Sequence, residues 1–311
     1  MTMIIKLSDK AFDSKKMDLV AEDKFIQIVD FLWQQSDKVT LRDIKRAFPE
    51  IEITDNYIEE LVSYGFITRH HGKYMLGIPV ITANKQQQIN EVCVAYLDEH
   101  LSDTLSRIGT SSNIYFDLFV GVKNQEDVLY EETDFSINWL SQPSRITRTE
   151  AKQVTFLSLA SFYPYYSHNI ADYFNYLNRK SEHLPEAFLR LRKKLGDINP
   201  NYFVPYCERK LRRLEKGKTI SSEKEDIFMD ALIDMGYVTV EANNCLFHMM
   251  ILDTTDRTAD IQLVLEELAD IVTKEFTEFP DMSYALASIL MTWLQKNNAV
   301  KECQYVHGVL R

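Results

Sequence analysis

The sequence predicts a mainly helical protein of the α+β class, on three observations. Apolar residues recur at three- and four-residue spacings through most of the 311 residues, which is the period of one helical face. Two passages instead have the pattern of a helix that ends at a glycine and continues into a short hairpin. An apolar content of 45%, with 12% aromatic residues, can supply a core, so we expect a folded chain.

The first helix is expected over residues 22–35, which read EDKFIQIVDFLWQQ and carry apolar side chains at helical spacing. A short second helix is expected after Thr40, which stands three residues before Asp43 as in a capping box. Pro49 ends it. The buried face of residues 22–82 is predicted to include Phe25, Ile28, Leu32, Ile44, Ile58, Leu61, Val62 and Ile67.

A third helix is expected to start at one of the N-cap candidates Thr54, Asp55 or Asn56 and to end at Gly65. The residues after it, FITRHHGKYML, read as two short strands joined by a turn at His71 and Gly72. Three helices closed by a hairpin resemble a winged helix-turn-helix, and residues 1–82 are assigned to this domain. The phrase VTLRDIKRAFP is also similar to an uncharacterised domain family of low-GC Gram-positive bacteria, which has no activity to transfer.

Residues 83–140 are predicted to form a long connecting helix, a strand over 113–122 and an acidic loop. The helix carries an apolar stripe between Ile89 and Ile108 on one face. A winged helix of about 60 residues has little spare surface to cover such a stripe, and regulators of this type read paired half-sites as dimers. We therefore expect a homodimer, with this helix or the last two helices at the interface.

Residues 141–311 are predicted to be a largely helical domain, with helices from Thr147 onward. Within it, DALIDMGYVTVEANNCLFHM repeats the first hairpin passage at one constant offset, which brings Gly236 onto Gly65, and Asn243 and Asn244 are expected in the turn. Ser222, three residues before Glu225, is expected to cap its helix. This predicts a possible second winged helix near residues 201–252, although any helix that ends in glycine before a strand gives the same pattern.

The charge distribution is uneven. The net charge is −11, yet residues 179–218 hold twelve Lys and Arg against five Asp and Glu. In a DNA-reading winged helix the third helix enters the major groove. Here that helix carries three acidic residues, Asp55, Glu59 and Glu60, and no lysine or arginine. Lysine and arginine residues on either side of this helix must therefore bind the phosphates. The candidate nucleic-acid-binding residues are Arg42, Lys45, Arg46, Asn56, Arg69, His70, His71, Lys73, Arg209, Lys210, Arg212, Arg213 and Lys216. Among them, Asn56 is the residue expected to read a nucleotide base. For the basic residues between Arg209 and Lys216, the alternatives are an ordinary solvated face and a surface for an acidic protein partner.

The sequence favours three functions, in order. The first is a non-catalytic regulatory protein that binds duplex DNA mainly through phosphate contacts. The second is an adaptor whose winged helix, or whose acidic C-terminal helices, dock to another protein without DNA contact. An enzyme is third, because no catalytic constellation, metal-ligand spacing or phosphate-binding glycine loop occurs. We expect no cofactor, no metal and no membrane contact. Four widely spaced cysteines and the lack of a signal peptide or apolar span favour a cytoplasmic protein.

Overall fold

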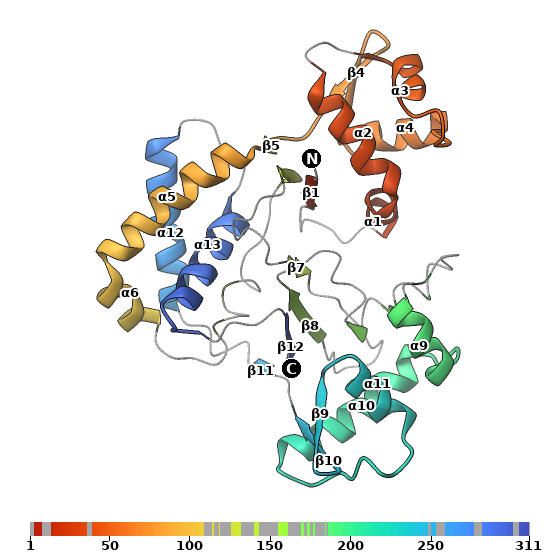
Figure 1. Ribbon diagram of the computed structural model, residues 1–311, viewed down its shortest axis with the longest axis vertical. Helices are drawn as coiled ribbons and strands as arrows, with labels where there is room; N and C mark the ends of the chain where they lie inside the picture. Colours follow the sequence, from red (N-terminus) through yellow and green to blue (C-terminus); the bar gives the residue numbers. More distant parts are fainter. Residues whose placement is uncertain are drawn as a thin grey trace. The chain divides into compact units, whose positions relative to one another are not determined.

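The computed structural model describes residues 3–7, 14–35, 39–108, 114, 118, 126–131, 140–142, 155–160, 169–170, 173–174, 177, 184, 186–247, 250–252, 259–276, 282–300 and 305–310 (Figure 1). The chain divides into two compact units. Unit 1 comprises Met1–Leu101, Val122–Ile137 and Leu265–Ile289, and unit 2 comprises Ser102–Gly121, Asn138–Val264 and Leu290–Arg311. Helices and short sheets make up both, so the mainly helical α+β class is confirmed.

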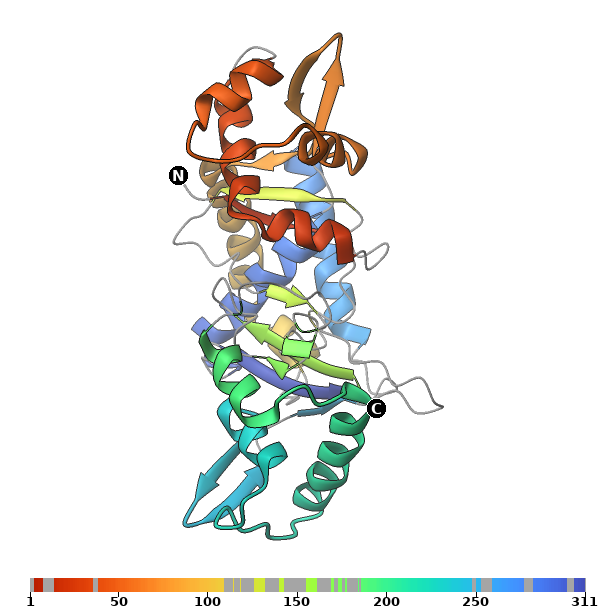
Figure 2. The same ribbon diagram turned by 90° about the vertical axis from the view of Figure 1, so that its right-hand side faces the viewer.

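The first part of unit 1, here called module 1, is built from four helices and a three-stranded sheet. The helices are α1 (Ser14–Ala21), α2 (Asp23–Gln34), α3 (Leu41–Ala47) and α4 (Asp55–Ser63). The strands are β2 (Val39–Thr40), β3 (Ile67–His70) and β4 (Lys73–Leu76), and β4 lies between the other two with antiparallel pairing to both. The two hydrogen-bonded strands of the hairpin project as paired arrows in Figure 2.

Local signals in the sequence set these boundaries. Thr40 caps α3 by a reciprocal pair of hydrogen bonds with Asp43, as predicted. Thr54 is the cap of α4, since its side chain accepts a hydrogen bond from the amide of Tyr57. Gly65 has a φ of 78°; its own amide donates to the carbonyl of Val62 and the amide of Phe66 donates to that of Leu61, which is the Schellman end of a helix.

The core of module 1 confirms most of the predicted buried face. Phe25, Ile28, Ile44, Ile58, Leu61 and Ile67 are fully buried, Leu32 is nearly so, and Val62 is half-buried. The same cluster also contains Met3, Leu19, Val20 and Leu129, which lie outside residues 22–82. Met3 and Leu129 belong to a second sheet of order β1-β6-β5, formed by β1 (Met3–Lys6), β6 (Val128–Glu131) and β5 (Val80–Ile81). A strand from beyond residue 82 therefore completes the core of this domain.

The long connecting helix is broken in two. Helix α5 (Ala83–Glu99) ends at His100, and α6 (Leu101–Ile108) starts again at once. The prediction of one continuous helix is wrong at this point, because His100 leaves helical geometry while its amide still donates to Tyr96. The strand predicted over residues 113–122 falls outside the described residues, except for Ile114 and Leu118, which are buried and helical.

Helix α5 runs antiparallel to α12 (Ala259–Glu275). Lys85, near the start of α5, lies 4.3 Å from the ring of Phe276, and the hydroxyl of Tyr96, near its end, donates to Glu267 at 3.2 Å. Helix α13 (Ser283–Lys296) is almost entirely buried. None of the described helices is long and apolar enough to cross a membrane.

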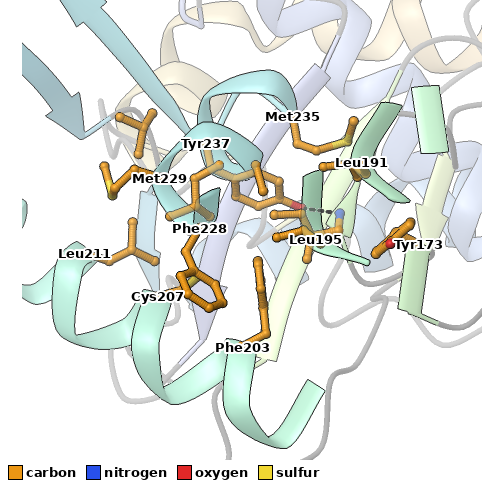
Figure 3. Packing of buried hydrophobic residues seen from close by; sticks show 14 of the residues in the cluster. Tyr173, Leu191, Leu195, Phe203, Cys207, Leu211, Phe228, Met229, Met235 and Tyr237 are labelled. Atoms are coloured by element: carbon orange, nitrogen blue, oxygen red, sulfur yellow. Dashed lines mark hydrogen bonds between the residues drawn. The ribbon is translucent and has the colours of Figure 1, made fainter. Parts of the chain in front are cut away.

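Unit 2 contains a second set of helices that closes with a hairpin, here called module 2. It comprises α9 (Glu186–Leu195), α10 (Pro200–Glu215), α11 (Ile227–Asp234), β9 (Val238–Glu241) and β10 (Asn244–Phe247). Its buried cluster is shown in Figure 3, where Phe203, Cys207 and Leu211 project from α10 toward Phe228 and Tyr237.

The constant offset between the two hairpin passages holds in three dimensions. Strands β3 and β4 map onto β9 and β10 with the same register, and the turn residues His71 and Gly72 map onto Ala242 and Asn243. All four turn residues have positive φ, as a type I′ turn requires. The predicted turn at Asn243 and Asn244 is therefore wrong by one residue, because Asn244 already pairs with Glu241 in the ladder.

The helix before the second hairpin also starts later than predicted. Asp226, and not Ser222, is its N-cap, since the Asp226 carboxylate accepts hydrogen bonds from the amides of Phe228 and Met229. The amide of Ser222 donates instead to the carbonyl of Asn243. The positive end of the helix dipole stabilises this carboxylate, and Lys210 lies beside it.

Module 2 lacks the counterpart of α3. In module 1, Thr40 pairs with Lys73 at the start of β4, and in module 2 the corresponding bridge joins Ser221 to Asn244 at the start of β10. The chain between the two bridge partners is shorter in module 2, and the residues that it lacks fall where α3 stands in module 1. The described segment between Ser221 and Asp226 forms turns and no helix.

The region predicted to be helical after residue 141 also contains a four-stranded sheet of order β11-β12-β8-β7. Its strands are β7 (Leu140–Gln142), β8 (Thr155–Ala160), β11 (Met250–Leu252) and β12 (Tyr305–Leu310). Only the β11-β12 pair is parallel. The buried ring of His307 in β12 stacks on Tyr237 of module 2 at 4.0 Å between ring centroids. The Tyr237 hydroxyl in turn accepts a hydrogen bond from the amide of Ile170.

Candidate nucleic-acid interface

The predicted recognition helix of module 1 is α4, and the structure neutralises its acids locally. Asp55 lies 2.5 Å from the ammonium of Lys45 on α3, and Glu59 lies 2.7 Å from the guanidinium of Arg69 on β3. Glu60 is paired in the same way with Lys15, at 2.7 Å. Two of the predicted phosphate contacts, Lys45 and Arg69, are therefore already opposite carboxylates. Each exposed ion pair of this kind contributes at most about 1 kcal/mol to the stability of the fold. Their main effect here is to neutralise charge on the surface around α4.

The other candidates in module 1 are exposed on α3, on α4 and at the tip of the hairpin. Arg42 and Arg46 are exposed on α3, and Arg46 is 4.0 Å from Asp43. Asn56 is exposed in the first turn of α4. His70, His71 and Lys73 are exposed at the tip of the hairpin and form no ion pair with any described residue. Module 1 thus has few positively charged side chains that are free to contact phosphate around its acidic helix.

Two of the five candidates on α10 are held in ion pairs. The ammonium of Lys210 lies 2.6 Å from the Asp226 carboxylate that caps α11, and both groups are mostly buried. Tyr206 also donates to that carboxylate, at 3.2 Å. The hydrogen bond with Asp226 raises the pKa of Lys210. Arg212 forms an ion pair with Glu208 one turn earlier on the same helix. Lys210 therefore joins α10 to α11, and its charge is not available to a ligand.

The pKa of Asp226 is lowered despite its partial burial. Burial alone would raise it, but the hydrogen bond from Lys210, the helix amide of Met229 and the hydroxyl of Tyr206 together outweigh that effect. The carboxylate is therefore ionised at neutral pH. It is satisfied by its neighbours within module 2, which is the arrangement of a structural ion pair.

The remaining three candidates on α10 form what is here called the basic stripe: Arg209, Arg213 and Lys216. They are exposed and form no ion pair with any residue that the structure describes. Their spacings of four and three residues put them on one face of the helix. The sequence placed Arg212 on this face as well, but its pairing with Glu208 separates it from the others. The stripe is the clearest concentration of available positive charge among the predicted residues.

The described residues show neither a side-chain cluster suited to a metal ion nor an exposed cysteine. No group of three or more His, Cys, Asp or Glu side chains among them is close enough to hold a metal ion. The described cysteines, Cys93, Cys207 and Cys245, are buried, and burial raises the pKa of each thiol. A buried thiol with a raised pKa is a poor nucleophile. His168, His183 and His248 lie outside the described residues.

The stripe predicted as a dimer surface is covered within the chain. Ile89, Cys93 and Leu97 of α5 are fully buried, and Ile108 of α6 is nearly so. Of the C-terminal helices named as the other possible interface, α13 is almost entirely buried, whereas α12 buries one apolar face and exposes polar residues together with Leu263. Much of the apolar surface on which the expectation of a homodimer rested is thus covered within one chain, and the homodimer itself stays a prediction.

The comparisons with known proteins concern the first third of the chain. Residues 5–110 match the model of a family described as a domain of unknown function (DUF1803). This range covers module 1, α5 and α6, and it agrees with the similarity of VTLRDIKRAFP to an uncharacterised domain family. No curated protein and no solved structure matches the chain.

Proposed function

We propose that this chain is a non-catalytic, cytoplasmic, DNA-associated regulatory protein that carries a winged helix in module 1 and a shortened relative of it in module 2. The element order α2, β2, α3, α4, β3, β4 is that of a winged helix-turn-helix, and it supports this assignment. The step from such a fold to DNA is an analogy, because one fold can serve many functions. Support for DNA binding therefore depends on the charged side chains at the surface.

The single observation that carries the proposal is the basic stripe of module 2. Its three cations have no acidic partner among the described residues, although the chain as a whole is acidic with a net charge of −11. Maintaining unpaired like charges three and four residues apart on a helix is unfavourable by itself, since they repel. A polyanion such as DNA would relieve that repulsion, and contacts to phosphates need no particular base sequence.

Module 1 contributes less in this proposal. The ion pairs of α4 place carboxylates where a major-groove helix would approach phosphates and base edges. The exposed hairpin tip, with Lys73 and the two histidines, can add a contact to the backbone from outside the groove. The binding mode is therefore one of phosphate contacts, with little direct reading of bases.

The test is the salt dependence of duplex binding by the full chain, measured by fluorescence anisotropy between about 50 and 200 mM salt. Arg213→Glu/Lys216→Glu should weaken binding on all sequences alike and flatten the slope of log affinity against log salt by about 2. The matched control is Lys274→Glu/Lys296→Glu, which makes the same charge change at two exposed lysines on α12 and α13. Absence of duplex binding at the lowest salt, or an equal loss in the control, would refute the proposal.

A second candidate function is an adaptor that binds another protein through module 1. The observation in its favour is that all three acids of α4 are paired, which leaves a nearly neutral face of exposed polar side chains. Neutral, polar faces suit transient protein contacts better than DNA. This candidate predicts that Lys45→Glu/Arg69→Glu leaves any duplex binding by module 2 unchanged, since the two bases would not contact phosphate.

A further inference from the structure

The outer face of α10 combines aromatic and basic side chains in one line. Tyr202 and Tyr206 precede the basic stripe, and the spacings along the line are four, three, four and three residues. Such spacings keep all five side chains on one helical face. From Tyr202 to Lys216 the line extends over about 21 Å at 1.5 Å per residue. The five residues are called the Tyr–Arg stripe below: Tyr202, Tyr206, Arg209, Arg213 and Lys216.

Most of this face is exposed, although Tyr206 also packs against the core of module 2. The opposite face carries Phe203, Cys207, Leu211 and Leu214, all buried, and Figure 3 shows the first three directed toward α11. Tyr202 is 62% exposed, more than any other large hydrophobic side chain that the structure describes. Its ring lies 5.9 Å from that of Phe228, measured between centroids, in a tilted arrangement. Most of a large aromatic side chain is therefore in contact with water.

Tyr206 is fixed in place within the stripe. Its ring packs on Phe228 at 4.2 Å, and its hydroxyl donates to Asp226. The guanidinium of Arg209 lies 5.4 Å from the centre of the same ring. A cation over an aromatic face is held there by the ring quadrupole. Arg209 is therefore positioned at the middle of the stripe without an acidic partner taking its charge.

The comparison with module 1 explains why this face is open. The buried positions Phe25, Val29 and Leu32 of α2 have the same spacing as the buried positions Cys207, Leu211 and Leu214 of α10, and in this register the buried Ile28 falls on Lys210. In the same alignment Phe31 corresponds to Arg213. In module 1, Phe31 packs against Phe48 at the end of α3, with 5.7 Å between the ring centroids. Module 2 has no counterpart of α3, and an arginine replaces the phenylalanine that such a helix would cover.

We infer that the Tyr–Arg stripe binds nucleic acid with unpaired bases in preference to duplex, with Tyr202 as the platform on which a base stacks. In a duplex the bases are already stacked inside, so only the three cations would find partners and the Tyr202 ring would gain nothing. On a single strand, the cations hold the phosphates while the exposed ring accepts a base. The inference rests on the proposed function, because it names the form of nucleic acid that the same surface selects.

The experiment compares two labelled probes with the full chain, an oligothymidine strand of about 20 nucleotides and a duplex of the same length, in a salt series by fluorescence anisotropy. The single strand should bind at least about fivefold more tightly than the duplex. Tyr202→Ala should weaken strand binding by about 5- to 150-fold and leave the salt slope unchanged, because no charge is lost. Duplex binding should change by less than about twofold.

Two further variants separate stacking from packing. Tyr202→Phe keeps the aromatic face and should bind the strand within about twofold of the natural protein. Tyr202→Leu keeps the apolar contact with Phe228 but has no aromatic face, so it should lose affinity as Tyr202→Ala does. Arg213→Glu should weaken both probes and lower both slopes by about 1. Circular dichroism melting of each variant checks that α10 is still folded, and an exposed position such as Tyr202 should leave the melting temperature nearly unchanged.

The possible outcomes are distinct. Equal affinity for strand and duplex, or strand binding that Tyr202→Leu leaves intact, would overturn this inference and leave the proposed function standing. Binding of neither probe at about 50 mM salt would overturn both. A polyglutamate chain that binds more tightly than the strand at the same charge concentration would also overturn it, and would identify an acidic protein segment as the partner of the stripe.

Discussion

Because the hairpin passage occurs twice, the same substitution can be made at equivalent positions of the two modules and its effects on stability compared. Leu61 in α4 and Leu232 in α11 are equivalent positions of the repeated passage, and both are fully buried. Each also accepts, through its backbone carbonyl, the hydrogen bond that ends its helix. Leu61→Ala and Leu232→Ala remove the same side-chain atoms from equivalent places in two different cores.

Each substitution should cost about 2–5 kcal/mol, because the lost transfer free energy adds to the cavity that the neighbours cannot close. Leu61 packs in a cluster that contains Phe25, Phe66 and Ile58, so the rigid rings around it favour the upper part of this range. Val62 is the matched control. It is half-buried on the same helix, and Val62→Ala should cost about 1 kcal/mol or less.

The assay is native-state hydrogen exchange of the full chain, read by mass spectrometry in peptides from residues 55–76 and 227–247. A loss of about 2–5 kcal/mol lowers protection by about 30-fold or more, since 1.4 kcal/mol is a factor of ten. Leu61→Ala should lower protection in the first peptides and not in the second, and Leu232→Ala should do the reverse. A change below about 0.5 kcal/mol, or an equal loss in both modules, would show that the two buried clusters are not separate cores.

Two other predictions concern ionisable groups in the same modules. Asp226→Ala removes the cap of α11 and the partner of Lys210, and it should destabilise module 2 by about 1–3 kcal/mol in urea unfolding followed by the same exchange peptides. The pKa of Asp226 is lowered, so its contribution to stability is present above the ordinary pKa of aspartate and is lost as acid protonates the carboxylate. The pKa of Lys210 is raised, so its contribution is present below the ordinary pKa of lysine and is lost as the ammonium deprotonates at high pH. A cost for Asp226→Ala that is the same at pH of about 2 as at neutral pH would contradict this. Burial raises the pKa of Cys93 to about 12 and also raises that of Cys207, so iodoacetamide at neutral pH should label neither until urea unfolds the chain. Labelling of either thiol in the folded protein would place it on the surface.

Some features of the candidate site are local and were readable from the sequence. The spacing of Arg209, Arg213 and Lys216 on one helix is visible in any helical projection, and so is the acidic character of α4. The sequence did not indicate which lysine and arginine side chains would be neutralised by ion pairs with carboxylates. Lys45 and Asp55 belong to different helices, as do Lys210 and Asp226, so their pairing depends on how those helices meet. Tyr202 was not singled out either, although its spacing from Tyr206 and Arg209 was available.

The sequence by itself determined the elements whose signals lie within a few residues. The Thr40 capping box, the Gly65 helix end and the turn at His71 and Gly72 depend on backbone hydrogen bonds and on φ preferences of adjacent residues, and these act before any tertiary contact forms. The second copy of the hairpin followed from the same signals. It was visible because the same local chemistry occurs twice.

Only the tertiary structure decided the rest, because it depends on contacts between distant segments. Strand β12 is formed at the end of the chain and pairs with β8, which comes from the middle of it, so no local pattern could indicate the four-stranded sheet. The apolar stripe of α5 was a correct reading of a buried face, but the sequence could not say that α12 of the same chain would lie along it. The open face of α10 likewise results from a helix that module 2 does not have. Burial is a property of the neighbours of a residue, and the sequence of one segment contains no information about which neighbours it will meet.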